Sequence, residues 1–178
     1  KRQTEALSQQ RRKPTAISSE ITGLLYGQMV HKLLEIVDWR CGEVEEEWAA
    51  SQIKDICDDE NLIRKAIHSV RKILSSDLIR RIVQSRSYYK EVPFAYAKNG
   101  TIFEGKIDVL FIEGDDVILV DFKTDRVAGK DVAKEAHRYK PQIEIYSDAI
   151  EACLGRAPKE VILFFTEPCV EFSVSMDR

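Results

Sequence analysis

The Asn99-Gly100 pair is the feature that most constrains the fold of this chain. Both positions of a two-residue β-hairpin loop require a positive φ angle, which Asn and Gly tolerate better than other residues. The flanking segments, residues 91–98 and 101–112, are rich in the β-branched and aromatic residues that favour strands. The sequence therefore predicts an antiparallel hairpin with its tip at Asn99-Gly100.

The hairpin fixes which residues face each other across its two strands. If Asn99-Gly100 is the whole loop, Lys98 lies opposite Thr101, and the same register places Glu91 opposite Asp108. Directly opposed side chains have Cβ atoms about 4.5–5.5 Å apart on one face of the sheet. We therefore expect these two carboxylates to be neighbours.

A second tight turn follows at residues 113–116, with the sequence Glu-Gly-Asp-Asp. With Gly114-Asp115 as its loop, the same reasoning places Asp108 opposite Asp121 on a third strand. Glu91, Asp108 and Asp121 then share one row of a three-stranded antiparallel meander.

The two faces of this meander are expected to differ in character. Because side chains alternate along a strand, Lys106 and Lys123 project on the same side as Asp108 and Asp121. The opposite side is apolar and consists of Ile107, Val109, Phe111, Ile118, Val120 and Phe122. We therefore expect one face to pack on the core and the other to carry charge.

The row of acids calls for a cation. Like charges directly across a ladder destabilise a sheet, so stability alone gives no reason to place Asp108 opposite Asp121 within such apolar strands. A divalent cation between them would remove the repulsion. Carboxylate ligands without thiolates suit hard ions such as Mg²⁺ or Mn²⁺, which keep open positions for water and phosphate oxygens. We therefore predict a metal site with Lys123 beside it.

The residues from Asp108 to Lys123 have the spacing Asp-x12-Asp-Phe-Lys, which is that of the PD-(D/E)xK nuclease signature. The surrounding segment, GKIDVLFIEGDDVILVDFKTD, resembles the nuclease domain of the RecB/AddA family of helicase–nucleases. Two further motifs follow the family's order, Gly27-x3-His31-x3-Glu35 upstream and Tyr139-x2-Gln142-x3-Tyr146 downstream. The resemblance thus covers most of the chain.

The resemblance implies both a fold and an activity. The implied fold is α/β, a restriction-endonuclease-like mixed sheet flanked by helices. The implied activity is that of a Mg²⁺-dependent deoxyribonuclease, with Mn²⁺ also able to serve, acting as the exonuclease module of a RecBCD/AddAB-type helicase–nuclease in double-strand break repair and recombination. The implied partners are DNA, the helicase portion of the same parent chain and a partner subunit.

The resemblance also implies roles for residues at matching positions. His31, Asp108, Asp121 and the Phe122 carbonyl are expected to hold the metal. Lys123 is expected either to position and help deprotonate the attacking water or to offset charge in the transition state.

Five further residues are expected near this site. Tyr139 and Gln142 are candidates for holding the attacking water or the DNA strand, and Tyr146 lies on the same side of their helix. Glu91 is either a metal ligand through water or a residue that orients a ligand. Glu35 either supports a ligand in the same way or is an ordinary helix charge.

Helices are expected on both sides of the meander. Upstream, an apolar pattern with Ser18 or Ser19 as N-cap predicts a helix that ends near Trp39 and carries the His31 motif along one stripe. Downstream, a helix is expected from about Asp131 to Cys153, kinked or restarted at Pro141. Two closing strands are expected last, at Val161–Phe165 and Val170–Val174.

Two charged stretches, acidic over residues 43–60 and basic over residues 64–90, are also expected to be helical. Solvated helix faces account for most such runs. Alternatively, helical spacing in the basic stretch suits a stripe that follows a phosphate backbone, formed by Arg64, His68, Arg71 and Lys72. The net charge of −3 argues against strong DNA binding by this domain alone, so we expect a motor or partner to deliver the strand.

Length and composition fit one globular domain, with 178 residues of which 44% are hydrophobic. Without a signal peptide or an 18-residue apolar run, we expect a cytoplasmic protein that does not contact membranes. The polar, basic start without an initiator Met favours a leader over residues 1–16, ahead of a nuclease domain over residues 17–178, in a piece of a longer protein. The four cysteines, Cys41, Cys57, Cys153 and Cys169, lack the close spacing found in iron–sulfur relatives, so we expect reduced thiols and no cluster.

Three other interpretations compete with an active nuclease module. A catalytically silent DNA-binding or docking module would have lost a metal carboxylate or the lysine, and neither is lost. A purely structural interaction domain gives no reason to place three acids in one row. A free-standing nuclease of the same superfamily remains an alternative. The chain has no G-x4-G-K-(S/T) phosphate-binding loop, so any helicase activity must lie elsewhere.

Overall fold

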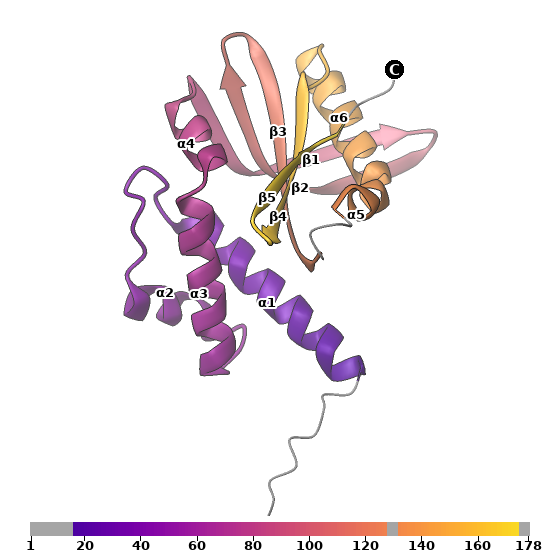
Figure 1. Ribbon diagram of the computed structural model, residues 1–178. Helices are drawn as coiled ribbons and strands as arrows, with labels where there is room; N and C mark the ends of the chain where they lie inside the picture. The colour runs from indigo at the N-terminus through magenta and orange to yellow at the C-terminus, as the bar shows by residue number, and fades with distance from the viewer. Residues whose placement is uncertain (1–15, 128–131, 175–178) are drawn as a thin grey trace, which may run out of the picture.

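The computed structural model describes residues 16–127 and 132–174 of the chain. Residues 1–15 of the expected leader, and the expected helix start at Asp131, lie outside the described residues. Six helices and five strands are found within them (Figure 1). In chain order they are α1 (Ala16–Ile36), α2 (Glu46–Ile53), α3 (Glu60–Leu74), α4 (Asp77–Gln84), β1 (Ser87–Lys98), β2 (Thr101–Glu113), β3 (Asp116–Arg126), α5 (Val132–Arg138), α6 (Lys140–Leu154), β4 (Glu160–Glu167) and β5 (Val170–Ser173).

The five strands form one sheet whose spatial order equals the chain order, β1-β2-β3-β4-β5. Neighbouring strands are antiparallel except β3 and β4, which run parallel. A parallel pair requires a crossover connection, and α5 and α6 lie in that connection. The mixed sheet flanked by helices confirms the expected α/β class.

The meander has the predicted register. Lys98 pairs with Thr101, and Glu113 pairs with Asp116, so both predicted loops are two residues long. The first loop, Asn99-Gly100, has φ angles of 52° and 79°, as such a turn requires. The register that was predicted from the two turns is therefore confirmed.

Both faces of the sheet are covered by apolar side chains, which corrects the expectation of one apolar and one charged face. Towards α1, α3 and α4, one core contains Val109, Phe111, Ile118, Val120 and Phe122. Towards α5 and α6, a second core contains Val117 and Leu119, with Leu110 and Ile112 packed against it. The crossover helices bury this second face, and the charged Asp121 and Lys123 lie buried within β3.

Ile107 also departs from the expected alternation. It is expected on the same side as Val109, but it belongs to the second core. Opposite this level of β2, the β1 backbone is irregular, because Glu91 has a φ angle of 51°. The period of two is interrupted there, and sequence alternation alone cannot show such an interruption.

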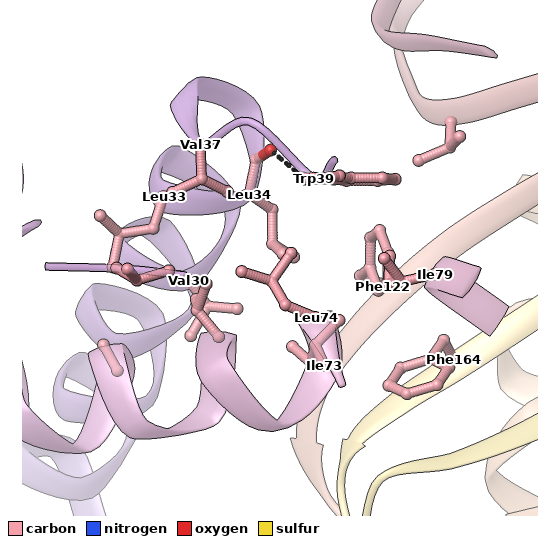
Figure 2. Packing of buried hydrophobic residues seen from close by; sticks show 14 of the residues in the cluster. Val30, Leu33, Leu34, Val37, Trp39, Ile73, Leu74, Ile79, Phe122 and Phe164 are labelled. Carbon is pink, nitrogen blue, oxygen red and sulfur yellow. Dashed lines mark hydrogen bonds between the residues drawn. The ribbon is translucent and has the colours of Figure 1, made fainter. Parts of the chain in front are cut away.

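Helix α1 differs from its predicted ends. It begins at Ala16, so Ser18 and Ser19 lie inside the helix and not at the N-cap position, and it stops before Trp39. The Trp39 indole folds back and donates a 2.9 Å hydrogen bond to the Leu34 carbonyl, which satisfies an acceptor near the helix end (Figure 2). The apolar pattern located the helix but not its first and last turns.

Helix α1 is fixed by the first core. Figure 2 shows Val30, Leu33 and Leu34 of α1, with Val37 just after the helix, in one cluster with Ile73 and Leu74 of α3 and Phe122 and Phe164 of the sheet. Full burial of one such side chain contributes about 1.5–3 kcal/mol. The helix that carries His31 is therefore held firmly against β3.

The remaining elements largely follow the predictions. The expected helix over residues 131–153 is split at Tyr139, and Pro141 lies in the first turn of α6, where its missing N–H costs nothing. The expected closing strands are β4 and β5. The basic stretch is helical in α3 and α4 but enters β1 at Ser87, because Tyr-Tyr extends the strand pattern. Within the described residues, no helix is long and apolar enough to cross a membrane.

Candidate metal centre

The β2–β3 ladder ends where the two aspartates of the predicted row face each other. The last backbone pair joins Val109 and Val120, so Asp108 and Asp121 occupy the next level of the register. There a side-chain acceptor replaces a backbone carbonyl, because Asp108 Oδ2 accepts a 2.7 Å hydrogen bond from the Phe122 amide. The side chain of Asp108 is thereby fixed between the separating strands.

Glu91, Asp108 and His31 form a compact cluster of potential metal ligands. One ligand atom from each lies within 4.8 Å of the other two, and His31 Nδ1 is 3.4 Å from Asp108 Oδ1. The positive φ angle of Glu91 is uncommon for a residue with a side chain, and such strain often accompanies a functional site. Strands β1 and β2 and helix α1 each contribute one donor.

Asp121, which was expected to be a ligand, lies outside this three-residue cluster and forms an ion pair with Lys123. Only 4% of the Asp121 side chain and 11% of the Lys123 side chain are exposed. Burial, and next the charge of Asp108, raise the pKa of Asp121 to about 6, and Lys123 only partly offsets this. The pair therefore leaves negative charge uncompensated beside Asp108.

The same excess of negative charge acts on the cluster. Burial alone would lower the pKa of His31, but the hydrogen bond and charge of Asp108 raise that pKa overall. Burial, and then the charge of Asp108, raise the pKa of Glu91, although Lys106 Nζ lies 3.6 Å from its carboxylate. A divalent cation would favour ionised carboxylates and a neutral imidazole.

The donor set fits a divalent cation. Carboxylate oxygens and an imidazole nitrogen, with no sulfur, suit Mg²⁺ or Mn²⁺. A cavity of about 10 Å³ touches His31, Glu91 and Asp108, and about 10–15 Å³ is enough for one water molecule. Glu35 also lines this cavity, but its carboxylate accepts a 3.0 Å hydrogen bond from Lys32.

The downstream motif surrounds the Lys123 ammonium group. Lys123 Nζ donates a 2.7 Å hydrogen bond to Gln142 Oε1, and Gln142 Nε2 donates one of 2.6 Å to the Tyr146 hydroxyl. The Tyr139 ring lies 4.1 Å from Nζ, within the range of a cation–π contact. The Tyr139 hydroxyl donates to the Asp125 carboxylate. Helix α6 and the residue before it thus orient the lysine.

Gly27 allows α1 to approach β3 closely. A Cβ atom at this position would lie 2.8 Å from Thr124 Oγ1, which is closer than real Cβ contacts. One turn later on the same stripe, His31 reaches Asp108. The glycine of the upstream motif therefore permits the close packing of α1 on β3, next to the point where His31 reaches the cluster.

Two neighbours of the cluster were missed by sequence reasoning. Lys90, expected in a helical basic run, lies on β1 and donates hydrogen bonds of 3.1 and 2.8 Å to the Leu34 and Val37 carbonyls. Its ammonium is 5.1 Å from the centre of the Trp39 ring. Asp125, which holds Tyr139, was also missed. Its place two residues after Lys123 was the one available signal.

One of the four residues in the suggested phosphate-tracking stripe on α3, Arg71, has another partner. Arg64, His68 and Lys72 are exposed. The Arg71 guanidinium is instead turned towards the loop before α2, where it donates hydrogen bonds of 2.9 and 3.2 Å to the Val44 carbonyl. The role of the other three stays a prediction.

A family model described as "PD-(D/E)XK nuclease superfamily" matches residues 5–173. The match includes all five strands and every candidate site residue named above.

The chain is also similar to curated proteins whose names describe each of them as a subunit of an "ATP-dependent helicase/nuclease". It is 34% identical over 174 residues to the protein of Bacillus cereus (strain ATCC 10987 / NRS 248), with 82% of this chain and 14% of the relative covered. It is 35% identical over 143 residues to that of Thermoanaerobacter sp. (strain X514), with 68% and 12% covered. For Acetivibrio thermocellus the identity is 29% over 164 residues, with 82% and 13% covered. The chain therefore spans only 12–14% of the length of these relatives.

Proposed function

The chain belongs to the PD-(D/E)XK nuclease superfamily, and from that membership we propose that it is a metal-dependent deoxyribonuclease that hydrolyses phosphodiester bonds. The observation that carries the proposal is the arrangement at the level where the β2–β3 ladder ends. There Asp108 lies near the buried Asp121–Lys123 pair and beside two further ligand candidates, His31 and Glu91. A stable fold alone would not require this concentration of buried charge.

The proposed metal ion is Mg²⁺, and the imidazole of His31 would allow Mn²⁺ to serve as well. The residues proposed to hold it are His31, Asp108, Asp121 and the Phe122 carbonyl. When bound, the ion would polarise the phosphodiester and stabilise the charge of the in-line transition state. The position of Glu91 beside Asp108 supports a contribution to the same ion, directly or through water.

Lys123 is proposed to act on the attacking water and on the phosphate. Its ammonium is oriented from two sides by Gln142 and Tyr139 and charge-paired with Asp121. A cation fixed in this way can position the water nucleophile and offset negative charge as the transition state forms, without reorganising during the reaction.

The surrounding residues are proposed to support these groups. Gln142 and Tyr139 hold Lys123, and they are candidates for contact with the water or the strand. Tyr146 orients Gln142, and burial, followed by the charge of Asp121, raises the pKa of Tyr146 to about 12, so its hydroxyl stays protonated. Glu35 lines the cavity beside His31 and is proposed to orient the cluster from behind.

The biological setting proposed here follows from the relatives. Their name supports the proposal that the chain is the exonuclease module of a RecBCD/AddAB-type helicase–nuclease acting in double-strand break repair and recombination. Its partners would then be DNA, the helicase portion of the parent chain and a second subunit, in the cytoplasm. The net charge of −3 supports delivery of the strand by such a partner.

Cleavage of labelled single-stranded DNA, linear and circular, tests this proposal with Mg²⁺, Mn²⁺ or EDTA. The wild type is compared with Asp121→Ala and Lys123→Ala, and Lys159→Ala removes a lysine that is exposed on the surface and paired with Asp116. We expect metal-dependent cleavage that falls at least 100-fold in the first two variants and not in the third. Binding of DNA without cleavage by the wild type, with either metal, would indicate a silent docking module instead.

A further inference from the structure

Strands β1 and β2 continue as a two-stranded arm beyond the rest of the sheet. The pairing of β2 with β3 begins at Val109, whereas the pairing of β2 with β1 extends to Thr101. A hairpin alone is only marginally stable in water and needs packing from another element. Figure 1 shows this arm, residues 92–107, beside α6. The arm and the helix that carries Gln142 therefore support each other.

Phe94 is the aromatic contact between the arm and α6. Its ring meets the Tyr146 ring edge-on, with centroids 5.3 Å apart and an interplanar angle of 77°. Lys98 Nζ also donates a 2.5 Å hydrogen bond to Asp148, but both side chains of that pair are partly exposed, so the pair contributes little. Phe94 packs against the second core, to which Tyr146 belongs. The position of Tyr146 therefore depends on Phe94.

Gly105 leaves room for the Phe94 ring. The two residues face each other across the β1–β2 ladder. A Cβ atom at Gly105 would lie 3.0 Å from Cε1 and 3.3 Å from Cζ of Phe94, which is tighter than most real Cβ contacts. A glycine inside a strand often marks such a close approach, and an aromatic ring on the neighbouring strand can cover it. The ring is thus held in contact with both Gly105 and Tyr146.

Tyr146 connects this packing to Lys123. The Tyr146 hydroxyl accepts a 2.6 Å hydrogen bond from Gln142 Nε2, and Gln142 Oε1 accepts one of 2.7 Å from Lys123 Nζ. A side-chain amide has its donors at one end and its acceptor at the other, so the bond to Tyr146 fixes which end faces the lysine. A turned amide would present its NH₂ group to the ammonium, and neither group can accept a hydrogen bond. Each link from Phe94 to Lys123 is therefore a direct contact.

We propose that Phe94 is a positioning residue for phosphodiester hydrolysis. Through Tyr146 and Gln142, it keeps the Lys123 ammonium in place. The inference rests on the proposed nuclease function and gives the β1–β2 arm a part in it. Phe94 does not line the cavity at the ligand cluster. Substitution of Phe94 should therefore lower kcat and leave the metal affinity and KM nearly unchanged.

Three variants and a matched control separate this role from general packing of the arm. Phe94→Leu keeps an apolar side chain but removes the ring, and Gly105→Ala keeps the ring but displaces it. Gln142→Ala removes the contact through which Phe94 is proposed to act. Tyr96→Leu is the control, because it removes another half-buried aromatic ring two residues along β1, on the same face of the arm.

The test measures kcat and KM of each variant for labelled linear single-stranded DNA with Mg²⁺, together with the Kd for Mn²⁺. We expect kcat to fall about tenfold in Phe94→Leu and in Gly105→Ala, because small displacements of a positioned group are costly, while KM and the Kd for Mn²⁺ change less than about twofold. Tyr96→Leu should keep the kcat of the wild type. Added to Gln142→Ala, Phe94→Leu should cause no further loss, since both act on the same contact.

A kcat of Phe94→Leu equal to that of the wild type would overturn the inference. An equal loss in Tyr96→Leu would also overturn it, as would a further loss of similar size when Phe94→Leu is added to Gln142→Ala. If urea denaturation shows that Phe94→Leu does not fold, Gly105→Ala serves the same comparisons.

Absence of cleavage by the wild type would contradict the proposed nuclease function instead. The positioning role is then tested without activity, by NMR of the side-chain amide of Gln142, which Gln142→Ala identifies by its missing resonances. We expect these resonances to move towards those of a free glutamine side chain in Phe94→Leu but not in Tyr96→Leu. Unchanged resonances in Phe94→Leu would contradict the inference.

Discussion

Asp121 is the residue whose charge is most affected by the fold. Burial and the charge of Asp108 raise its pKa to about 6, from an unfolded value of about 4. Because this folded-state pKa is the higher one, the metal-free folded protein binds a proton more tightly than the unfolded chain. The contribution of Asp121 to stability is therefore greatest at low pH and is lost as the pH rises through 6.

The variant Asp121→Asn isolates this contribution. In EDTA, we expect the free energy of unfolding of the wild type, relative to the variant, to fall by about 2–3 kcal/mol between pH 4 and pH 7. Loss of the partner of Lys123 adds a nearly constant offset, so only the change with pH matters. Urea denaturation at several pH values measures it, and a pH-independent difference would contradict the proposed electrostatics.

Gly27 sets the distance between α1 and β3. Gly27→Ala places a Cβ atom against the stiff Thr124 side chain, and overpacking of this kind costs about 1–3 kcal/mol. We expect the double variant Gly27→Ala/Thr124→Ala to recover most of the loss in urea denaturation. Gly23→Ala is the control, because it meets nothing and should stabilise the helix by up to about 1 kcal/mol. Equal behaviour of the two alanine variants would refute a close approach at Gly27.

At the scale of elements, Lys90 joins β1 to the end of α1. Its ammonium donates to two carbonyl groups at the helix C-terminus, and burial lowers its pKa. Lys90→Met leaves these acceptors without their charged donor, which we expect to cost about 2 kcal/mol by urea denaturation. Lys98→Met, which removes an exposed partner of Asp148, should change stability little. A similar effect of both variants would show that Lys90 does not join the two elements.

The elements that could be predicted are those specified by local chemistry. Two tight turns and side-chain alternation were enough to obtain the β1–β2–β3 register and the level of Asp108 and Asp121. The second apolar face could not be obtained in this way, because it depends on the α5–α6 crossover that packs on it. The irregularity at Glu91 and the first turn of α1 also depend on packing, which local patterns do not contain.

The candidate site was predicted in the same uneven manner. Spacing and family resemblance named His31, Asp108 and Lys123, and the structure brings them and the Gln142 motif together. The ion pair that turns Asp121 towards Lys123 required three-dimensional contacts. So did the partnership of Lys90 with α1. The roles in metal binding and catalysis assigned to His31, Asp108, Asp121 and Lys123 stay predictions until variants are measured.

At the scale of the whole molecule, the sheet and the helix packed on it bring the site residues together at one point. The ligand candidates come from α1, β1 and β2, and the Asp121–Lys123 pair comes from β3. The two cores hold these elements in place. The chain spans 12–14% of the length of these relatives. The central claim is that this point binds a divalent cation.

Titration with Mn²⁺, followed by the electron paramagnetic resonance signal of the free ion, tests that claim most directly. The wild type is compared with Asp108→Asn, which keeps the shape of a ligand but removes its charge. The control is Asp116→Asn at the far end of β3, where the side chain is 43% exposed. We predict that Mn²⁺ binds to the wild type and to Asp116→Asn with similar Kd, is displaced by Mg²⁺, and binds at least tenfold more weakly to Asp108→Asn. Equal Mn²⁺ affinity in all three proteins, or no binding by the wild type, would contradict the account.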